Sequence, residues 1–165
     1  MSIYIGYTGS AGVGKSTSVF EMARMCKIDN PYKRVAVITE TASESPMKIN
    51  TETTWQSQLW IFTKQINREL ELLNKYDIVI SDRTCFDCIA YTRVAGFLTL
   101  ADAMMQVAST HSILYTQIIF KSIANNNYFY KDGIRSQDTK FRQDMEDRLI
   151  EIYKEAGLWD NIIKE

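Results

Sequence analysis

The chain has 165 residues, of which 45% are hydrophobic and 12% aromatic, and these values predict one compact domain over 1–165 rather than a disordered segment. Its formal net charge of −1 argues against a protein that binds nucleic acid nonspecifically, although a local basic groove stays open. No apolar run reaches the roughly 18 residues of a membrane span, and no signal sequence opens the chain, so we expect a cytoplasmic protein without membrane contact.

Strand-like and helical patterns alternate along the chain. The expected strands are 3–7, 34–40, 77–82, 112–120 and a short one within 158–163; the expected helices are 15–26, 54–75, 86–108 with a break near Gly96, and 138–156. Polar stretches at 41–53 and 125–136 are expected to be loops. The alternation predicts a three-layer α/β protein in which a parallel sheet of about five strands carries helices on both faces.

A glycine-rich loop lies between the first strand and the first helix and matches the Walker A pattern G-x-x-x-x-G-K-[ST]. In such a loop successive backbone N–H groups form a nest for phosphates, and glycines let the backbone approach the nucleotide. Lys15 would reach the terminal phosphates, and the Ser16 hydroxyl would bind a Mg²⁺ ion that keeps most of its waters. We therefore expect a nucleoside triphosphate to bind at Gly9, Ser10, Ala11, Gly12, Val13, Gly14, Lys15, Ser16 and Thr17.

Charged residues follow the second and third strands, and ligands of open parallel sheets bind at the carboxyl ends of strands. Asp82 is expected to help hold Mg²⁺ or to orient the acceptor; its alternative is a helix cap or turn residue. Arg83 presents a fork suited to phosphate, with a structural ion pair as the alternative. Glu40 is a general base for a hydroxyl acceptor, a contact to sugar or base, or a solvated strand end.

Two further groups are candidates for the site. A lid over about 122–142 would bring Arg135 and Arg142 onto the transferred phosphoryl group, unless this segment is a surface loop of mixed charge. An acceptor pocket could be walled by Phe86, Tyr91 and Arg93, although aromatic residues at such positions are as often part of the core.

The cysteines offer a different chemistry. Cys85 and Cys88 have the C-x-x-C spacing of a redox pair or half a zinc site, but Cys26 and His111 lie far away in sequence. We expect small buried thiols beside the site, with His111 near a helix end.

The Gly-Ser-Ala-Gly-Val-Gly-Lys-Ser run, the Asp82-Arg83-Thr84 strand end and the segment Asp132-Gly-Ile-Arg135-Ser-Gln-Asp138-Thr-Lys-Phe-Arg142 resemble the P-loop nucleoside and nucleotide kinases, thymidylate kinases among them. The resemblance implies the three-layer P-loop NTPase fold. It also implies that Arg83 grips the phosphate of the acceptor and that Arg135 and Arg142 close on ATP. Thymidylate kinases carry Arg-Glu-Pro-Gly-Gly after the second strand, whereas this chain has Thr39-Glu40-Thr41-Ala42.

The Glu40 and Asp82-Arg83 arrangement is also similar to deoxynucleoside kinases and the nicotinamide riboside kinase domain, which phosphorylate a hydroxyl, and small phage kinases of this superfamily act on modified pyrimidines, even within DNA. The first expectation is transfer of the γ-phosphoryl group of ATP to a nucleoside monophosphate. The alternatives are transfer to a hydroxyl of a nucleoside or of a hydroxymethylpyrimidine in DNA, and a switch or assembly ATPase. Nucleic acid enters only as a substrate, and a homodimer is left open.

Overall fold

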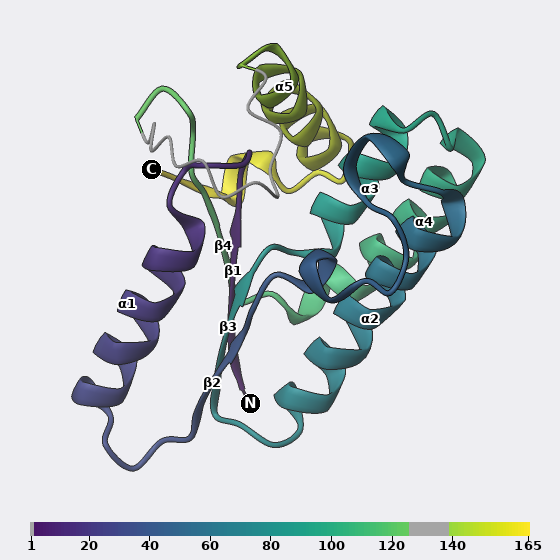
Figure 1. Cartoon of the computed structure of the whole chain (residues 1–165). Coiled ribbons are helices and arrows are strands. Elements are labelled where there is room, and N and C mark those ends of the chain that lie inside the picture. The colour runs from purple at the N-terminus through teal and green to yellow at the C-terminus, as the bar shows by residue number, and fades with distance from the viewer. Residues whose placement is uncertain (1, 126–138) are drawn as a thin grey trace.

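The computed structural model describes residues 2–125 and 139–165. Its centre is a parallel sheet of five strands in the order β2-β3-β1-β4-β5 (Figure 1). The strands are β1 Ile3–Thr8, β2 Val35–Ile38, β3 Ile78–Asp82, β4 Gln117–Phe120 and β5 Ile163–Lys164. The predicted α/β fold of the P-loop type is thereby confirmed.

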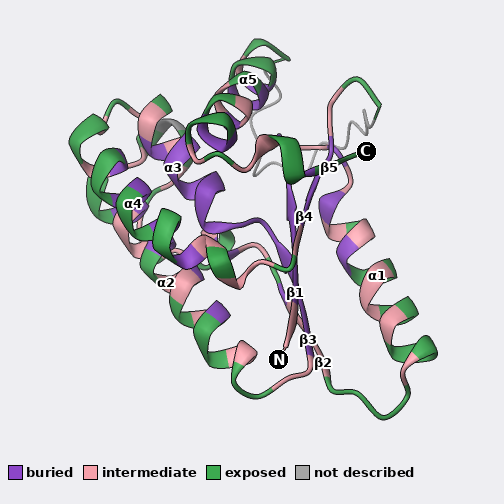
Figure 2. Cartoon of the chain, turned by 180° about the vertical axis from the view of Figure 1, so that it is seen from behind, coloured by how far each residue is buried: buried purple, intermediate pink, exposed green. Residues whose placement is uncertain are grey.

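Helices cover the two faces of this sheet unequally. Among the described residues, helix α1, Lys15–Asp29, lies by itself on one face, whereas the remaining α-helices gather on the other side (Figures 1 and 2). Those helices are α2 Trp55–Leu73, α3 Cys85–Val94, α4 Leu98–His111 and α5 Thr139–Glu155, and short 3₁₀ turns cover Thr41–Glu44, Asn50–Glu52, Ser112–Leu114 and Trp159–Asn161. In the described residues no helix is long and apolar enough to cross a membrane.

The core divides into apolar clusters on the two sides of the sheet. One packs α1 through Val19 against β1 and β3, and the larger one fills the space among α2, α3, α4 and α5. The strands read as nearly continuous apolar runs because both faces are covered, and β3 is buried along its whole length. This burial holds the ends of the strands in place.

Most predicted elements are found, with shifted ends. The expected break at Gly96 separates α3 from α4, and Gly96 adopts a φ of 86°, which favours glycine. The strand expected over 112–120 is shorter, because a 3₁₀ turn precedes β4. Residues 41–53, expected as a loop, contain two 3₁₀ turns.

Three chain segments converge at the carboxyl edge of the sheet. β1 and β3 pair in register from Ile3 opposite Ile78 to Tyr7 opposite Asp82, so Asp82 lies beside the start of the glycine loop. Glu40 follows the end of β2, which lies next to β3 on the side opposite β1. The order of the strands therefore places the predicted charged residues in a row next to the glycine loop.

Candidate active site

The glycine loop has the backbone that its sequence predicts. Gly9, Gly12 and Gly14 have φ values of 136°, 74° and 76°, in the region where a side chain is strained. A Cβ on Gly9 would also collide with the backbone oxygen of Lys121, which follows β4. Gly14 is the N-cap of α1, so the loop leads directly into the positive end of that helix.

Lys15 lies across the loop and is buried. Its Nζ donates hydrogen bonds to the backbone oxygens of Gly9 at 3.0 Å and Ser10 at 2.6 Å. Burial, together with the neighbouring positive charge of Arg83, lowers the pKa of the lysine from 10.5 to about 8. The ammonium is thus held at the loop with little water around it, where an anion would stabilise it.

Ser16 and Asp82 form the second part of the site. The Ser16 hydroxyl donates a hydrogen bond to Oδ2 of Asp82, which joins the first turn of α1 to the end of β3. A hydroxyl and a carboxylate are hard oxygen ligands, and Mg²⁺ in nucleotide sites takes few such protein ligands beside waters and phosphate oxygens. The two side chains fit that ion, although the described residues hold no cluster of three or more His, Cys, Asp or Glu side chains for a metal.

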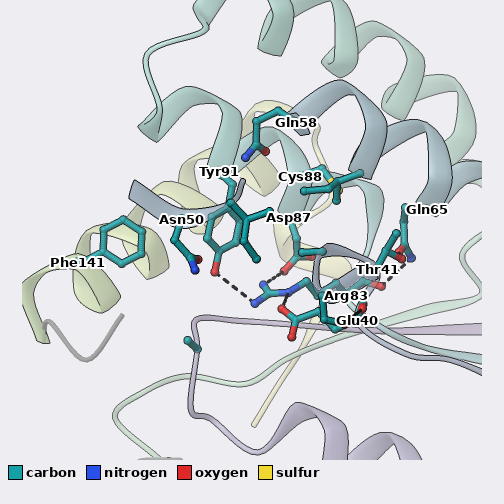
Figure 3. A pocket seen from close by; sticks show the side chains of 15 residues that line it. Glu40, Thr41, Asn50, Gln58, Gln65, Arg83, Asp87, Cys88, Tyr91 and Phe141 are labelled. Carbon is teal, nitrogen blue, oxygen red and sulfur yellow. Dashed lines mark hydrogen bonds and ion pairs between the residues drawn. The ribbon is translucent and has the colours of Figure 1, made fainter. Parts of the chain in front are cut away.

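Arg83 is the most constrained residue of the site. Its φ of 91° is rare for a residue with a side chain and costs about 1–3 kcal/mol, so its surroundings must hold it there. Nε donates to Oε1 of Glu40 at 2.7 Å, and the two terminal nitrogens donate to Oδ1 of Asp87 at 3.3 Å and to the hydroxyl of Tyr91 at 3.2 Å (Figure 3). The guanidinium carbon also lies 5.0 Å from the centre of the Tyr91 ring.

A pocket opens beside this arginine. It lies between the segment after β2, helices α2 and α3, and the first turn of α5, and it reaches the glycine loop at Ala11 (Figure 3). Its lining residues are Ala11, Glu40, Thr41, Ala42, Ser43, Ile49, Asn50, Gln58, Ile61, Gln65, Arg83, Asp87, Cys88, Tyr91 and Phe141. The pocket therefore connects the phosphate loop to a mainly uncharged chamber with charged groups at one wall.

The structure brings some predicted acceptor residues together and separates others. Glu40, Arg83 and Tyr91 line the pocket. Phe86 does not: its side chain is fully buried and packs on Tyr153, with ring centres 5.2 Å apart.

Arg93 is also absent from the pocket wall. It pairs with Glu155 at 2.6 Å and with Asp102 at 3.6 Å on another side of α3. The expectation that Phe86 and Arg93 wall the pocket is corrected. Phe86 and Arg93, seven residues apart, lie on the side of α3 that faces α5, whereas Asp87, Cys88 and Tyr91 lie on the side that faces the pocket.

Sequence reasoning missed Asp87 and Gln65. Asp87 is the N3 residue of the capping box that Thr84 opens at the start of α3, and the Thr-x-x-Asp pattern could have identified it. Gln65 lies in the middle of α2 among residues expected to form its apolar face, and no local pattern marks it.

The segment predicted to be a lid, 122–142, is described only at its ends. Arg135 lies outside the described residues, as does most of the predicted lid. Arg142, in α5, is buried, donates from Nε to the backbone oxygen of Ala11 at 2.8 Å and accepts from the Ser10 hydroxyl through its own backbone oxygen at 2.9 Å. The start of α5 is therefore attached directly to the glycine loop.

The cysteine thiols are free, and Cys88 lines the pocket. Burial raises the pKa of Cys85 and Cys88, which suits inert thiols better than reactive ones. His111 is the last residue of α4, as expected, and its ring contacts the buried carboxylate of Glu69.

A parallel sheet, a glycine loop leading into a helix, a buried lysine and a serine–aspartate pair together define a P-loop nucleotide-binding protein. The chain belongs to the AAA domain family, whose model matches residues 5–163. A comparison with curated protein sequences finds no match.

Solved structures share the fold at low identity. A thymidylate kinase from Ehrlichia chaffeensis has a TM-score of 0.68 at 16% identity, covering 99% of this chain and 85% of that one. A deoxyadenosine kinase from M. mycoides, solved with dCMP and dCDP, has a TM-score of 0.62 at 18% identity, covering 99% and 89%. The NadR protein in complex with NR has a TM-score of 0.75 at 19% identity; this chain is covered to 99% but spans only 45% of NadR.

Proposed function

We propose that the protein is an ATP-dependent kinase that transfers the γ-phosphoryl group to a hydroxyl group of a nucleoside or of a hydroxymethylated pyrimidine. The observation that carries the choice of acceptor is the pairing of Arg83 with two carboxylates, Glu40 and Asp87. The kinase neighbours in structure support phosphoryl transfer as the reaction.

The charge beside the pocket argues for a neutral acceptor group. The reason to expect a monophosphate is that Arg83 needs an anion, and Glu40 and Asp87 already supply two negative charges to its one positive charge. A phosphate would have to displace a carboxylate from a guanidinium that is 10% exposed, while repelling the other one. A hydroxyl requires no such exchange.

Glu40 has the position of a general base in this proposal. Its side chain is 22% exposed and lines the pocket, so an acceptor hydroxyl can reach it. Arg83 keeps the carboxylate oriented through the 2.7 Å hydrogen bond to Oε1. Tyr91 and Phe141 offer aromatic surfaces on which a planar base could lie.

In this proposal the glycine loop binds ATP. Lys15 and the backbone N–H groups of the loop bind the phosphates of ATP, and Ser16 with Asp82 would hold Mg²⁺. When bound, Mg²⁺ supplies charge neutralisation at the phosphate oxygens. Arg142 and Arg135 are proposed to complete the site from the lid, Arg142 from its place against Ala11.

The first expectation, transfer to a nucleoside monophosphate, remains a second candidate. It is favoured by the overall fold likeness to a thymidylate kinase and by the planar, bidentate chemistry of Arg83 at the pocket wall.

A switch or assembly ATPase is the candidate of another class. It predicts hydrolysis that a protein partner accelerates and no small acceptor does.

The experiment is an acceptor panel with ATP labelled at the γ position. Nucleosides, nucleoside monophosphates, and single- and double-stranded DNA containing 5-hydroxymethylpyrimidines are each incubated with the protein and Mg²⁺, next to a sample without acceptor. We expect label in a phosphomonoester on a nucleoside or a hydroxymethylated base. Label found only in nucleoside diphosphates would overturn the hydroxyl assignment in favour of the monophosphate.

A further inference from the structure

A buried group of hydrogen bonds lies behind the charged wall of the pocket, centred on the side-chain amide of Gln65 in α2. Gln65 is 1% exposed. Its Oε1 accepts from the Thr41 hydroxyl at 2.6 Å, and its Nε2 donates to the Ser81 hydroxyl at 3.0 Å and, at 3.4 Å, to the backbone oxygen of Arg83 (Figure 3 labels Gln65 and Thr41). One side chain thus contacts the segment after β2 and the segment after β3.

The chemistry of its neighbours fixes which way this amide points. The Ser81 hydroxyl donates its hydrogen to the backbone oxygen of Arg83 at 2.6 Å, so its oxygen is left to accept from Gln65. A backbone oxygen can only accept. Nε2 of Gln65 must therefore face Ser81 and Arg83, and Oε1 must face Thr41.

A buried carboxylate reinforces this orientation. Oε1 of Glu69, one helical turn further along α2, accepts one N–H of the Gln65 amide at 2.8 Å, so the other N–H is shared between Ser81 and the more distant Arg83 backbone oxygen. Glu69 is itself held by the Tyr115 hydroxyl at 3.1 Å and by the ring of His111. Because these partners come from different elements, the amide cannot rotate without breaking several hydrogen bonds.

The contacts of Gln65 bear directly on the two charged residues of the acceptor site. Thr41 follows Glu40 in the chain, and the Arg83 backbone oxygen belongs to the residue held at a φ of 91°. The backbones at Glu40 and Arg83 must keep their relative positions for Nε of Arg83 to reach Oε1 of Glu40. Gln65 links the two backbones that carry them.

We propose that Gln65 is a positioning residue for phosphoryl transfer, which keeps Arg83 in its strained backbone conformation and holds Glu40 at the proper distance from it. The inference rests on the proposed function, because it concerns the same acceptor site. Gln65 acts through Glu40 and Arg83, and the ATP side of the site, at the glycine loop, does not depend on it.

The kinetic test uses Gln65→Leu, which keeps the volume and removes the amide. We expect kcat/KM for the acceptor to fall by roughly tenfold or more, as the loss of one or more buried hydrogen bonds would cause, with KM for ATP changed less than twofold. Thr41→Val removes the same link from its other end and should shift kcat/KM in the same direction, should Gln65→Leu fold poorly. Thr63→Ala, on the exposed face of the same helix, is the control and should match the parent.

A double-mutant cycle separates positioning from general stabilisation. In an Arg83→Lys background, Gln65→Leu should lower kcat/KM by less than twofold further, because the group through which it acts is already impaired. Fully additive losses, or equal increases in the two KM values, would overturn the inference.

A second readout does not need transferase activity. The Nε–H resonance of Arg83 in the ¹⁵N-labelled protein reports its hydrogen bond to Glu40, and it should move in Gln65→Leu and stay in Thr63→Ala. An unmoved Arg83 resonance with unchanged acceptor kinetics would overturn the inference and leave the proposed function standing. If the parent protein phosphorylates no hydroxyl, the proposed function fails, and the Arg83 resonance still decides whether Gln65 positions this residue.

Discussion

The Nε of Arg83 donates a 2.7 Å hydrogen bond to Oε1 of Glu40, joining the ends of two neighbouring parallel strands that lie 43 residues apart in the chain. Asp87 adds a second carboxylate to the same guanidinium. The net charge around Arg83 is therefore less positive than the presence of an arginine at this strand end suggests. The proposed transfer to an uncharged hydroxyl group rests on this charge.

Replacing Glu40 by Gln tests its role as a base. The amide keeps the size of the side chain and can still accept from Arg83, but it cannot take a proton. We expect kcat to fall by about 10²- to 10⁴-fold with little change in KM for ATP. Turnover within a few-fold of the parent would remove Glu40 from the chemistry and favour the monophosphate acceptor.

Ser16→Ala and Asp82→Asn test the proposed Mg²⁺ ligands. Each change removes one member of the hydrogen-bonded pair, and we expect the Mg²⁺ concentration for half-maximal activity to rise by about 10- to 100-fold. Titration of activity with Mg²⁺ at saturating ATP measures it. An unchanged half-maximal concentration in both variants would contradict the assignment.

Gly9→Ala should disrupt the phosphate loop. The new Cβ would meet the backbone oxygen of Lys121 at a backbone conformation, φ 136°, that alanine disfavours. We expect at least tenfold weaker ATP binding by calorimetry, together with a lower melting temperature. Gly96→Ala is the matched control: its φ is also positive and no atom lies within 4 Å of the added Cβ, so it should cost about 1–2 kcal/mol of stability and leave ATP affinity unchanged.

Two substitutions in α3 distinguish the pocket side of this helix from its outer side. Tyr91→Phe removes the hydroxyl that accepts from Arg83, and we expect KM for the acceptor to rise by about three- to tenfold. Arg93→Ala breaks pairs with Glu155 and Asp102, whose side chains are 49% and 70% exposed, so it should cost about 1 kcal/mol of stability and leave KM unchanged. A larger effect of Arg93→Ala on KM would restore it to the pocket.

The thiols give a test that depends on pKa. Burial raises the pKa of Cys85 and Cys88, so the thiolate fraction at pH 8 is small for both, whereas Cys26 is partly exposed and its pKa is raised less. With an alkylating reagent at pH 8, mass spectrometry should find Cys26 modified first and the other two only after unfolding. Rapid modification of Cys85 and Cys88 in the native protein would revive a redox role for the C-x-x-C pair.

Local sequence is enough to predict the glycine loop and the strands. Gly9, Gly12 and Gly14 are needed because the backbone itself must adopt positive φ, and that requirement is met within a few residues of chain. The apolar runs that end in Glu40 and Asp82 mark the buried strands for the same local reason, and the carboxyl edge of a parallel sheet then brings them together.

The tertiary structure decided what those residues contact. The orientation of α3 about its own axis could not be predicted from its sequence. In the structure Tyr91 faces the pocket, whereas Phe86 belongs to the core and Arg93 pairs with Glu155. Asp87 and Tyr91 are close to Arg83 in the chain, but Glu40 lies 43 residues away and reaches Arg83 because β2 lies next to β3. The link from Gln65 to Ser81 depends on how α2 packs against β3. The sequence by itself determined that a phosphate-binding loop lies next to strands that end in acidic residues. Packing between distant elements decided that the carboxylate of Glu40 reaches Arg83 and helps to neutralise it. The physical reason is that the net charge of a site is the sum over groups that only the folded chain brings together.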